Sequence, residues 1–423
     1  MNFFARFKKL FLVIGFLALV FIIGYFIWRV FFSSEPLTPS PIDTETPGTI
    51  SEFPVAGPGT GNVIEPGTSG NLPGTVNQPS SGGGQNPPDN SLFTPSPTAV
   101  GGLTETTAIN RNPSLDITLN NNGQLQYYDR NDGKFYQLNS DGSKTTLSDK
   151  VFHSVQNVVW SPNSDKAVLE YPDGSKIVYN FSTQKQATLP SHWQDFSFSA
   201  DGSRLVSKSI GYDTSDSWLI VSNDDGSQAT GVEKIGDNYD KVYSAWSPGN
   251  QIAALYTEGV DFNRQEVYFV GLNGENFKST IIEGRGFQPK WSSEGSHLLY
   301  SVYNSSDDYN PRLWVVDATS DTIGQNRRQL TLQTWANKCT FASDTEVYCA
   351  VPEELPRGAG LLPQLADETK DLLYKIDLTT GSQKLIAIPD GYYNISQIAV
   401  PKDQNYLYFT DKFSGAVYQI KLR

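Results

Sequence analysis

The side chains that most often carry out catalysis or bind metals are scarce in this sequence. The chain has three His and two Cys in 423 residues. His153, His192 and His297 lack the spacing of a metal-ligand motif, and no G-x-S-x-G motif of a nucleophilic serine occurs. The turns at 129–133 and 223–226 contain Asp and Gly without the full spacing of a calcium-binding loop. The sequence therefore predicts no catalytic residue, no metal and no cofactor, and favours a protein that is not an enzyme.

Side chains suited to binding a partner gather in four segments, 210–217, 258–265, 304–311 and 351–371, which interrupt strand-like patterns. Long loops on a rigid scaffold are where function usually lies. Aromatic and charged side chains in such loops suit a protein or glycan partner with basic character. Ordinary surface insertions are the alternative. The candidate partner-binding residues are Tyr212, Asp213, Asp216, Phe262, Arg264, Asp307, Asp308, Tyr309, Glu353, Glu354 and Arg357.

The two cysteines have a spacing that suits a disulfide. Cys339 and Cys349 are equally far in sequence from Asp344, which lies at the centre of an expected hairpin turn. Residues at equal distances from a hairpin turn face each other on antiparallel strands, within reach of a disulfide bond. The sequence predicts a Cys339–Cys349 bond, with two buried free thiols as the alternative.

The elements that must position these residues are indicated by an internal repeat. A strand ends at Trp or Phe, a Ser-containing turn follows, and an alternating strand comes next, as in 160–171. Each unit continues with a third strand, a tight Asp/Asn/Gly turn and a Thr-rich fourth strand. Seven units of four antiparallel strands predict an all-β, seven-bladed β-propeller over residues 103–423. The units are marked by Leu119, Trp160, Phe198, Trp246, Trp291, Phe341 and Val400.

The repeated turn, clearest at Trp160, Phe198, Trp246 and Trp291, resembles the TolB-type, WD-repeat-like propeller repeat. The resemblance covers residues 103–423. It implies a bacterial envelope protein, because members of that family serve as envelope scaffolds, sensor ectodomains or non-catalytic partners of peptidases.

The N-terminal quarter of the sequence, residues 1–102, differs in composition from the repeats. Residues 10–32 are almost continuously apolar, long enough for a transmembrane helix. Basic residues lie at 6, 8 and 9, and none occurs between Arg29 and Arg111. The positive-inside rule then predicts a single-pass membrane protein with a cytoplasmic tail, 1–9, and an extracytoplasmic propeller. Residues 33–102 are rich in Pro, Gly, Ser and Thr and predict a disordered linker.

Charge excludes one class of partner. The net charge of −13 comprises +4 from residues 1–32, −6 from 33–102 and −11 from the propeller. An acidic domain repels phosphate backbones, so we expect no nucleic-acid partner.

The last unit is one strand short, because the chain ends at Arg423 after its third strand. The Thr-rich segment 104–109 precedes the first unit and is expected to supply the missing outer strand, closing the ring. Taken together, the sequence predicts a membrane-tethered interaction scaffold or sensor ectodomain in the cell envelope. The alternative is a propeller enzyme, a lyase or hydrolase, with its site at the central mouth.

Overall fold

The computed structural model describes residues 19–22, 25, 94–275, 277–319 and 321–423. The chain divides into two compact units, 1–83 and 84–423, and the second holds every described strand. The predicted tail 1–9 and most of the predicted linker, 33–93, lie outside the described residues.

The predicted single-pass membrane topology is contradicted. A membrane-spanning helix needs about 20 apolar residues, and no helix in the described part of the chain combines that length with sufficient hydropathy. Of the predicted span 10–32, only residues 19–22 and 25 are described.

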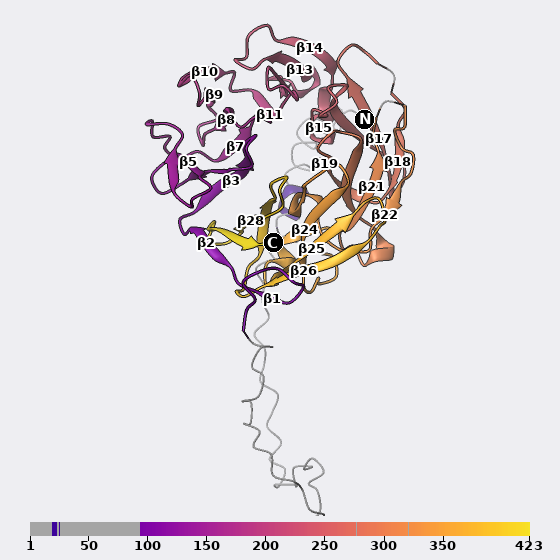
Figure 1. Cartoon of the computed structure of the whole chain (residues 1–423). Coiled ribbons are helices and arrows are strands. Elements are labelled where there is room, and N and C mark those ends of the chain that lie inside the picture. Colours follow the sequence, from indigo (N-terminus) through magenta and orange to yellow (C-terminus); the bar gives the residue numbers. More distant parts are fainter. Residues whose placement is uncertain (1–18, 23–24, 26–93, 276, 320) are drawn as a thin grey trace, which may run out of the picture. The chain divides into compact units, whose positions relative to one another are not determined.

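The prediction of a seven-bladed, all-β propeller is confirmed by seven antiparallel sheets ranged about a ring (Figure 1). Blades one to three consist of β3 (Ser114–Leu119), β4 (Leu125–Asp129), β5 (Lys134–Leu138) and β6 (Lys144–Thr146); β7 (Asn157–Trp160), β8 (Lys166–Glu170), β9 (Lys176–Asn180) and β10 (Lys185–Leu189); and β11 (Trp193–Phe198), β12 (Arg204–Ser209), β13 (Trp218–Asn223) and β14 (Thr230–Lys234).

The later blades repeat this order of strands. Blades four and five consist of β15 (Val242–Ser244), β16 (Ile252–Gly259), β17 (Arg264–Gly271) and β18 (Thr280–Glu283); and β19 (Arg285–Trp291), β20 (His297–Tyr303), β21 (Arg312–Asp317) and β22 (Arg328–Gln329). Blades six and seven contain β23 (Cys339–Phe341), β24 (Glu346–Pro352), β25 (Asp371–Asp377) and β26 (Gln383–Pro389); and β27 (Ile395–Ala399), β28 (Tyr406–Asp411) and β29 (Val417–Lys421). Short 3-10 helices lie in the connections: η2 (Thr214–Asp216), η3 (Gly236–Lys241), η4 (Ser305–Asp307), η5 (Ala336–Lys338) and η6 (Pro363–Ala366).

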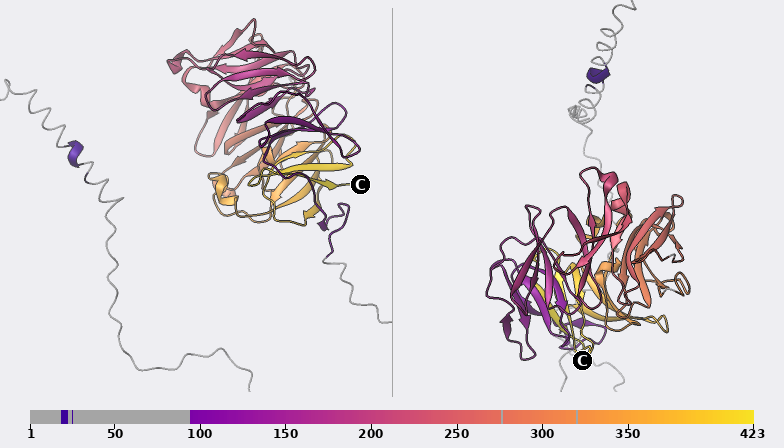
Figure 2. Two further views of the ribbon diagram at one scale, coloured as in Figure 1. Left: turned by 90° about the vertical axis from the view of Figure 1, so that its left-hand side faces the viewer. Right: turned by 90° about the horizontal axis from the view of Figure 1, so that it is seen from above.

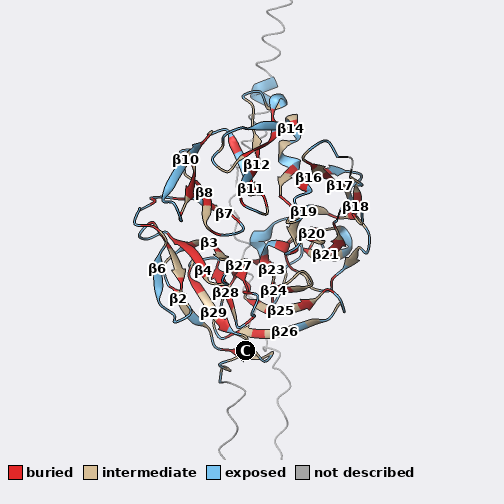
Figure 3. Ribbon diagram, turned by 45° about the horizontal axis from the view of Figure 1, so that its top comes forward, coloured by how far each residue is buried: buried red, intermediate tan, exposed pale blue. Residues whose placement is uncertain are grey.

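The core lies between the faces of neighbouring blades. Successive side chains of a strand point to opposite faces of its sheet, and both faces of a blade must be apolar. Leu169 of β8 packs in the cluster shared with blade one, and its neighbour Val168 packs in the cluster shared with blade three. Buried residues therefore line the middle strands, and outer strands such as β10 and β14 are exposed (Figure 3).

Both the Trp and the Ser of the repeated turn have a structural role. The indole N–H of Trp160 donates to the carbonyl oxygen of Asp116 in the preceding blade at 2.7 Å. The hydroxyl of Ser161 accepts from the backbone N–H of Lys166 and so fixes the turn. Trp291 and Ser292 repeat both contacts in blade five. In blades two and five the repeated residues thus hold the turn closed and join it to the preceding blade.

The ring closes as the sequence predicts. The strand β2 (Thr107–Asn110) pairs antiparallel with β29 and supplies the outer strand of blade seven. The remainder of the expected strand differs, because β1 (Leu103–Thr104) pairs in parallel with β26 and adds a fifth strand to blade six. In Figures 1 and 2 these indigo segments lie beside yellow strands from the end of the chain.

The end of the predicted linker belongs to this closure. Ala99 donates its backbone N–H to the carbonyl oxygen of Lys421 at 2.9 Å, and Gly101 donates to that of Ile386 at 2.7 Å. Residues 94–102 therefore contact two blades instead of continuing the linker. We call residues 94–110 the strap.

Cys339 and Cys349 form a disulfide in the structure, as directly paired residues of β23 and β24. Both residues are fully buried between blades five and six. The bond closes a loop between residues separated by 10 positions.

Reduction of this disulfide is expected to lower the free energy of unfolding by about 2–3 kcal/mol, because the cross-link restricts the unfolded chain. Urea unfolding with and without reductant measures the difference. A Cys339→Ala/Cys349→Ala variant is the control, since reductant must leave its midpoint unchanged. Labelling of two thiols in the unfolded, unreduced protein would show that the bond is absent.

Candidate functional site

The candidate site lies at one end of the ring. Strands of a blade alternate in direction, so connections between second and third strands share one end with the connections between blades. We call the second-to-third connections of blades three to seven the rim; they are residues 210–217, 260–263, 304–311, 353–370 and 412–416. The corresponding connections of blades one and two, 130–133 and 171–175, are as short as those of blades four and seven, but they expose no large apolar side chain.

Large apolar side chains are exposed mainly on the rim. In the part of the propeller that the structure describes, only Val100, Val151, Trp218, Ile281 and Tyr392 are exposed outside the rim, and Trp218 directly follows the rim segment of blade three. Large apolar side chains that stay exposed in one region of a folded domain are typical of a binding surface. The exposed apolar residues at this end are Tyr212, Val260, Phe262, Leu361, Leu362, Leu365 and Phe413 on the rim, with Val151 between blades one and two and Tyr392 between blades six and seven.

The predicted residues of blade three divide into one free aromatic side chain and two structural carboxylates. Tyr212 is fully exposed. Asp213 caps η2 by accepting the backbone N–H of Ser215 at 3.0 Å. Asp216 pairs with Lys234 at 3.2 Å, and both side chains are more than half exposed. The ring of Tyr212 is therefore the group that this connection offers to a partner.

The connection of blade four is shorter than the sequence suggests. The expected loop 258–265 is a four-residue turn, 260–263, because β16 and β17 continue as a hairpin. Phe262 at its tip is 74% exposed. Arg264 binds Asp261 at 2.6 Å, and this guanidinium holds the pKa of Asp261 below its usual range. The backbone oxygen of Phe262 accepts from Arg285 of blade five at 3.2 Å.

In blade five, the structure assigns Asp307 a supporting role. Its carboxylate accepts from the Arg312 guanidinium at 2.5 Å, and its side chain is only 13% exposed. Asp308 and Tyr309 both have left-handed backbone conformations, with φ of 55° and 57°. The tight turn projects Asp308 into solvent and leaves Tyr309 half-buried.

The connections of blades five and six are joined. Arg357 lies 3.5 Å from the carboxylate of Asp308. Gly358 donates its N–H to the carbonyl oxygen of Asp308 at 2.9 Å, and Gly360 donates to that of Tyr309 at 2.8 Å. These contacts bring the predicted residues Asp308, Tyr309 and Arg357 together.

The other predicted residues of blade six lie at the base of its connection. Glu353 pairs with Lys370 at 3.3 Å. Glu354 is exposed, and its backbone N–H reaches the hydroxyl of Thr369 at 3.4 Å. Among the described residues, no hydrogen bond or ion pair joins segment 353–370 to the rim segments of blades three and four.

A buried ion pair lies beneath the long connection of blade six. The Lys338 ammonium, on η5, is 2.9 and 2.8 Å from the two carboxylate oxygens of Asp371. Asp371 also accepts the backbone N–H of Ile395 in blade seven at 2.5 Å. Burial raises the pKa of Asp371 and lowers that of Lys338, and the attraction between the two charges opposes both shifts.

Asn394 connects this pair to the rim. Its amide N–H₂ donates to the backbone carbonyl of Ala366 at 2.8 Å, and its amide oxygen lies 3.5 Å from Lys338. A cavity of about 170 Å³ opens beside these groups, lined also by Trp335 and Lys412. The polar atoms of Lys338 and Asn394 are directed at Asp371 and the loop backbone, so this cluster positions the connection of blade six.

Several apolar rim residues are missing from the sequence-based candidates. Leu361, Leu362, Leu365 and Phe413 are exposed but carry no charge or hydrogen-bonding group that singles them out. The available signal is an apolar Leu361-Leu362 pair inside a segment without strand alternation. The aromatic residues near the connections between blades differ in exposure: Trp193, Phe287 and Trp335 are buried, whereas Tyr392 is exposed.

Comparisons with known proteins concern the fold. No protein-family model and no curated protein sequence matches the chain. Among solved structures, the tricorn protease is 11% identical with a TM-score of 0.48, covering 75% of this chain and 34% of its own. An oligogalacturonate lyase from Vibrio parahaemolyticus is 12% identical, with a TM-score of 0.47 and coverage of 75% and 93%. The Cps50 (Swd1) β-propeller domain from Myceliophteria thermophila is 12% identical, with a TM-score of 0.48 and coverage of 75% and 100%.

This comparison corrects one prediction. The expectation that the chain is not an enzyme is contradicted, because similar structures include an oligogalacturonate lyase and a protease. The likeness is one of fold and assigns no reaction, substrate or metal to this chain.

Proposed function

We propose that this propeller is a protein-interaction scaffold and that the rim binds its partner. The observation that carries the proposal is the gathering of exposed large apolar side chains at one end of the ring. When a partner covers such side chains, the burial of their apolar surface stabilises the complex by a free energy of roughly 25 cal/mol per Å². Tyr and Phe are also side chains that interfaces favour.

The charge of the rim supports a partner with basic character. The five rim segments hold nine acidic and three basic side chains. Ion pairs such as Asp308–Arg357 are exposed, so an incoming Lys or Arg can compete for the carboxylate. Complementary charge steers partners together and selects among them. The Trp-Ser-Pro turns that resemble the TolB-type repeat also support a scaffold role.

Site-specific photocrosslinking in intact cells tests the proposal. The photoreactive amino acid p-benzoylphenylalanine replaces Phe262 or Leu361 on the rim, and Asn121 or Glu294 in turns at the opposite end. We expect one common crosslinked protein from both rim positions and none from the two control positions, because only the rim is buried by the partner.

Substitutions on the rim provide the second arm of this test. Tyr212→Ser combined with Leu362→Ser is expected to lower the crosslinking yield at position 262 at least about tenfold, as loss of central apolar contacts does. Urea unfolding must give the same midpoint as the parent chain, since both side chains are exposed. Equal crosslinking from both ends of the ring would contradict the proposal.

A further inference from the structure

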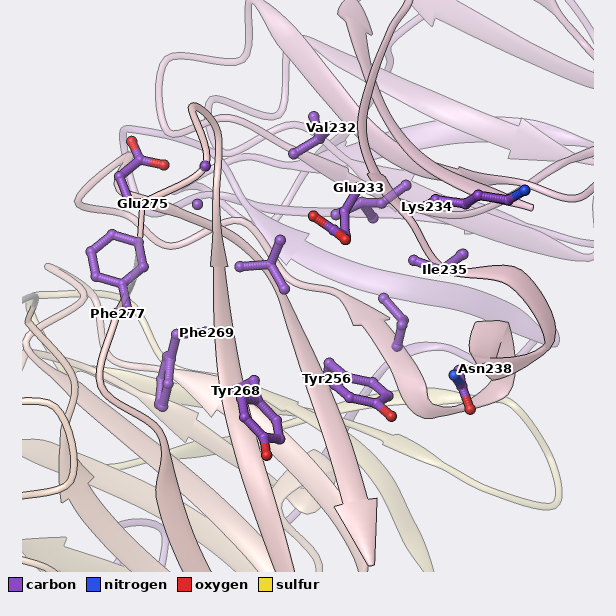
Figure 4. A pocket seen from close by; sticks show the side chains of 15 residues that line it. Val232, Glu233, Lys234, Ile235, Asn238, Tyr256, Tyr268, Phe269, Glu275 and Phe277 are labelled. Atoms are coloured by element: carbon purple, nitrogen blue, oxygen red, sulfur yellow. The ribbon is translucent and has the colours of Figure 1, made fainter. Parts of the chain in front are cut away.

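A second surface lies on the outer wall of the ring, in a cleft of about 460 Å³ between blades three and four (Figure 4). Blade three contributes β13, β14 and the start of η3, and blade four contributes β15, β16, β17 and the loop after β17. The floor is apolar: Leu219, Val232, Ile235, Val242 and Val270. Its volume is in the range of ligand sites, about 300–1,000 Å³.

Irregular outer strands create this cleft. β14 has a break in its register opposite Leu219 and Ile220. β18 pairs only with the first half of β17, from Arg264 to Val267. The second half of β17, 268–271, therefore extends past the outer strand of its own blade, and neighbouring blades separate there.

Two aromatic rings form one wall. Tyr256 and Tyr268 stack with centroids 5.6 Å apart and an interplanar angle of 29°. The hydroxyl of Tyr268 donates to Glu266 at 2.9 Å, which fixes that ring. The hydroxyl of Tyr256 has no hydrogen-bond partner among the described residues. The wall thus offers aromatic surface and one free hydrogen-bonding group.

The charges of the cleft are acidic. Figure 4 shows the Glu233 carboxylate turned into the cleft and the Lys234 side chain turned away from it. Lys234 is paired with Asp216, whereas Glu233 has no partner in the part of the chain that the structure describes. The carboxylate of Glu275, at the other end beside Phe277, accepts from the backbone N–H and the side-chain amide of Asn273 and forms no ion pair with a Lys or Arg of the described residues.

We infer that this cleft binds an extended segment of a protein partner in which a bulky apolar side chain is followed by Lys or Arg. The apolar side chain covers the floor between Val232 and Val270, and the Lys or Arg stem lies on the tyrosine wall. Its cationic head reaches the unpaired Glu233. The inference stands on the cleft alone and does not depend on the rim.

Selection from a phage-displayed library of random dodecapeptides on the immobilised full chain tests this inference. We expect enrichment of peptides that carry an apolar residue next to Lys or Arg. A synthetic copy of the most enriched peptide is then measured by fluorescence anisotropy. Glu233→Lys is expected to weaken its binding at least about tenfold by placing like charges together. Val270→Trp, which fills the floor, is expected to have a similar effect.

The matched control is Glu294→Lys, which reverses an exposed carboxylate in a turn far from the cleft in sequence and is expected to leave binding unchanged. The rim variant Tyr212→Ser/Leu362→Ser must also bind the peptide as the parent does, which separates this inference from the proposed function. Enriched peptides without a basic residue, or with unchanged affinity for Glu233→Lys and Val270→Trp, would overturn it. Self-association of the full chain that Glu233→Lys abolishes would assign the cleft to a second copy and would also overturn it.

Discussion

Asp371→Asn is expected to lower the free energy of unfolding by about 3–5 kcal/mol, the range found when one member of a buried ion pair is removed. The Asp371 side chain is fully buried and that of Lys338 is 9% exposed. Asparagine keeps the shape of the side chain but leaves the ammonium without a counter-charge. Deprotonation of Lys338 does not avoid the loss, because it also costs free energy at neutral pH.

Urea unfolding of the full chain measures this effect. Asp216→Asn is the matched control, since Asp216 forms an exposed pair with Lys234. Exposed pairs contribute about 0–1 kcal/mol, so this variant is expected to unfold close to the parent midpoint. If Asp371→Asn and Asp216→Asn lowered the free energy of unfolding equally, burial would not be the reason why the Lys338–Asp371 pair matters for stability.

Removal of both charges distinguishes a buried-charge penalty from simple loss of contacts. Lys338→Met/Asp371→Leu is expected to be more stable than Asp371→Asn, because no unpaired charge remains in the core. The rim provides an independent readout. Asn394 links the pair to the backbone of residue 366, so proteolysis within 353–370 is expected to accelerate in Asp371→Asn.

The fold could be predicted from sequence because its repeat depends on local chemistry. Trp160 and Ser161 make the same kinds of contact as Trp291 and Ser292, so the same residues recur wherever the same turn is needed. The pairing of Cys339 with Cys349 follows from a hairpin, which is also local. Structural features that depend on residues close in sequence, such as this turn and this hairpin, can be predicted without a structure.

The site was less predictable because its residues are selected by distant partners. Asp307 and Asp308 are adjacent, yet Arg312 binds one, and the connection of blade six contacts the other. Nothing in their sequence tells them apart. Lys338 and Asp371 lie 33 positions apart in sequence, and the fold of blade six brings them together from the end of η5, directly before β23, and the start of β25. The expected loop 258–265 was also too long. Residues 258–259 belong to β16 and residues 264–265 to β17, so the two strands extend the hairpin at both sides of the turn.

Removal of the strap is the second change with a large expected effect. A chain that begins at residue 111 loses β1 and β2, whereas a chain that begins at residue 94 keeps both. Four strap hydrogen bonds to blades six and seven join Ala99 to Lys421, Gly101 to Ile386, Ile388 to Gly102, and Asp390 to Thr104. At about 1 kcal/mol net for each bond, their loss alone removes about 4 kcal/mol. We expect the shorter chain to unfold at lower urea or to aggregate through the free edge of β29.

A covalent closure separates the contribution of the strap to ring closure from its local packing. Thr107 and Gln419 are paired residues of β2 and β29. A Thr107→Cys/Gln419→Cys disulfide would therefore tie β2, the outer strand of blade seven, to β29 at the end of the chain. This cross-link spans nearly the whole propeller, and loop-closure entropy gives it about 4 kcal/mol or more. Oxidation is expected to raise the unfolding midpoint, and reductant is expected to reverse the change. If the oxidised and reduced forms have the same urea midpoint, separation of β2 from β29 is not the step at which the propeller loses its stability. In that case the chain beginning at residue 111 must lose its stability at blade six, where β1 pairs with β26.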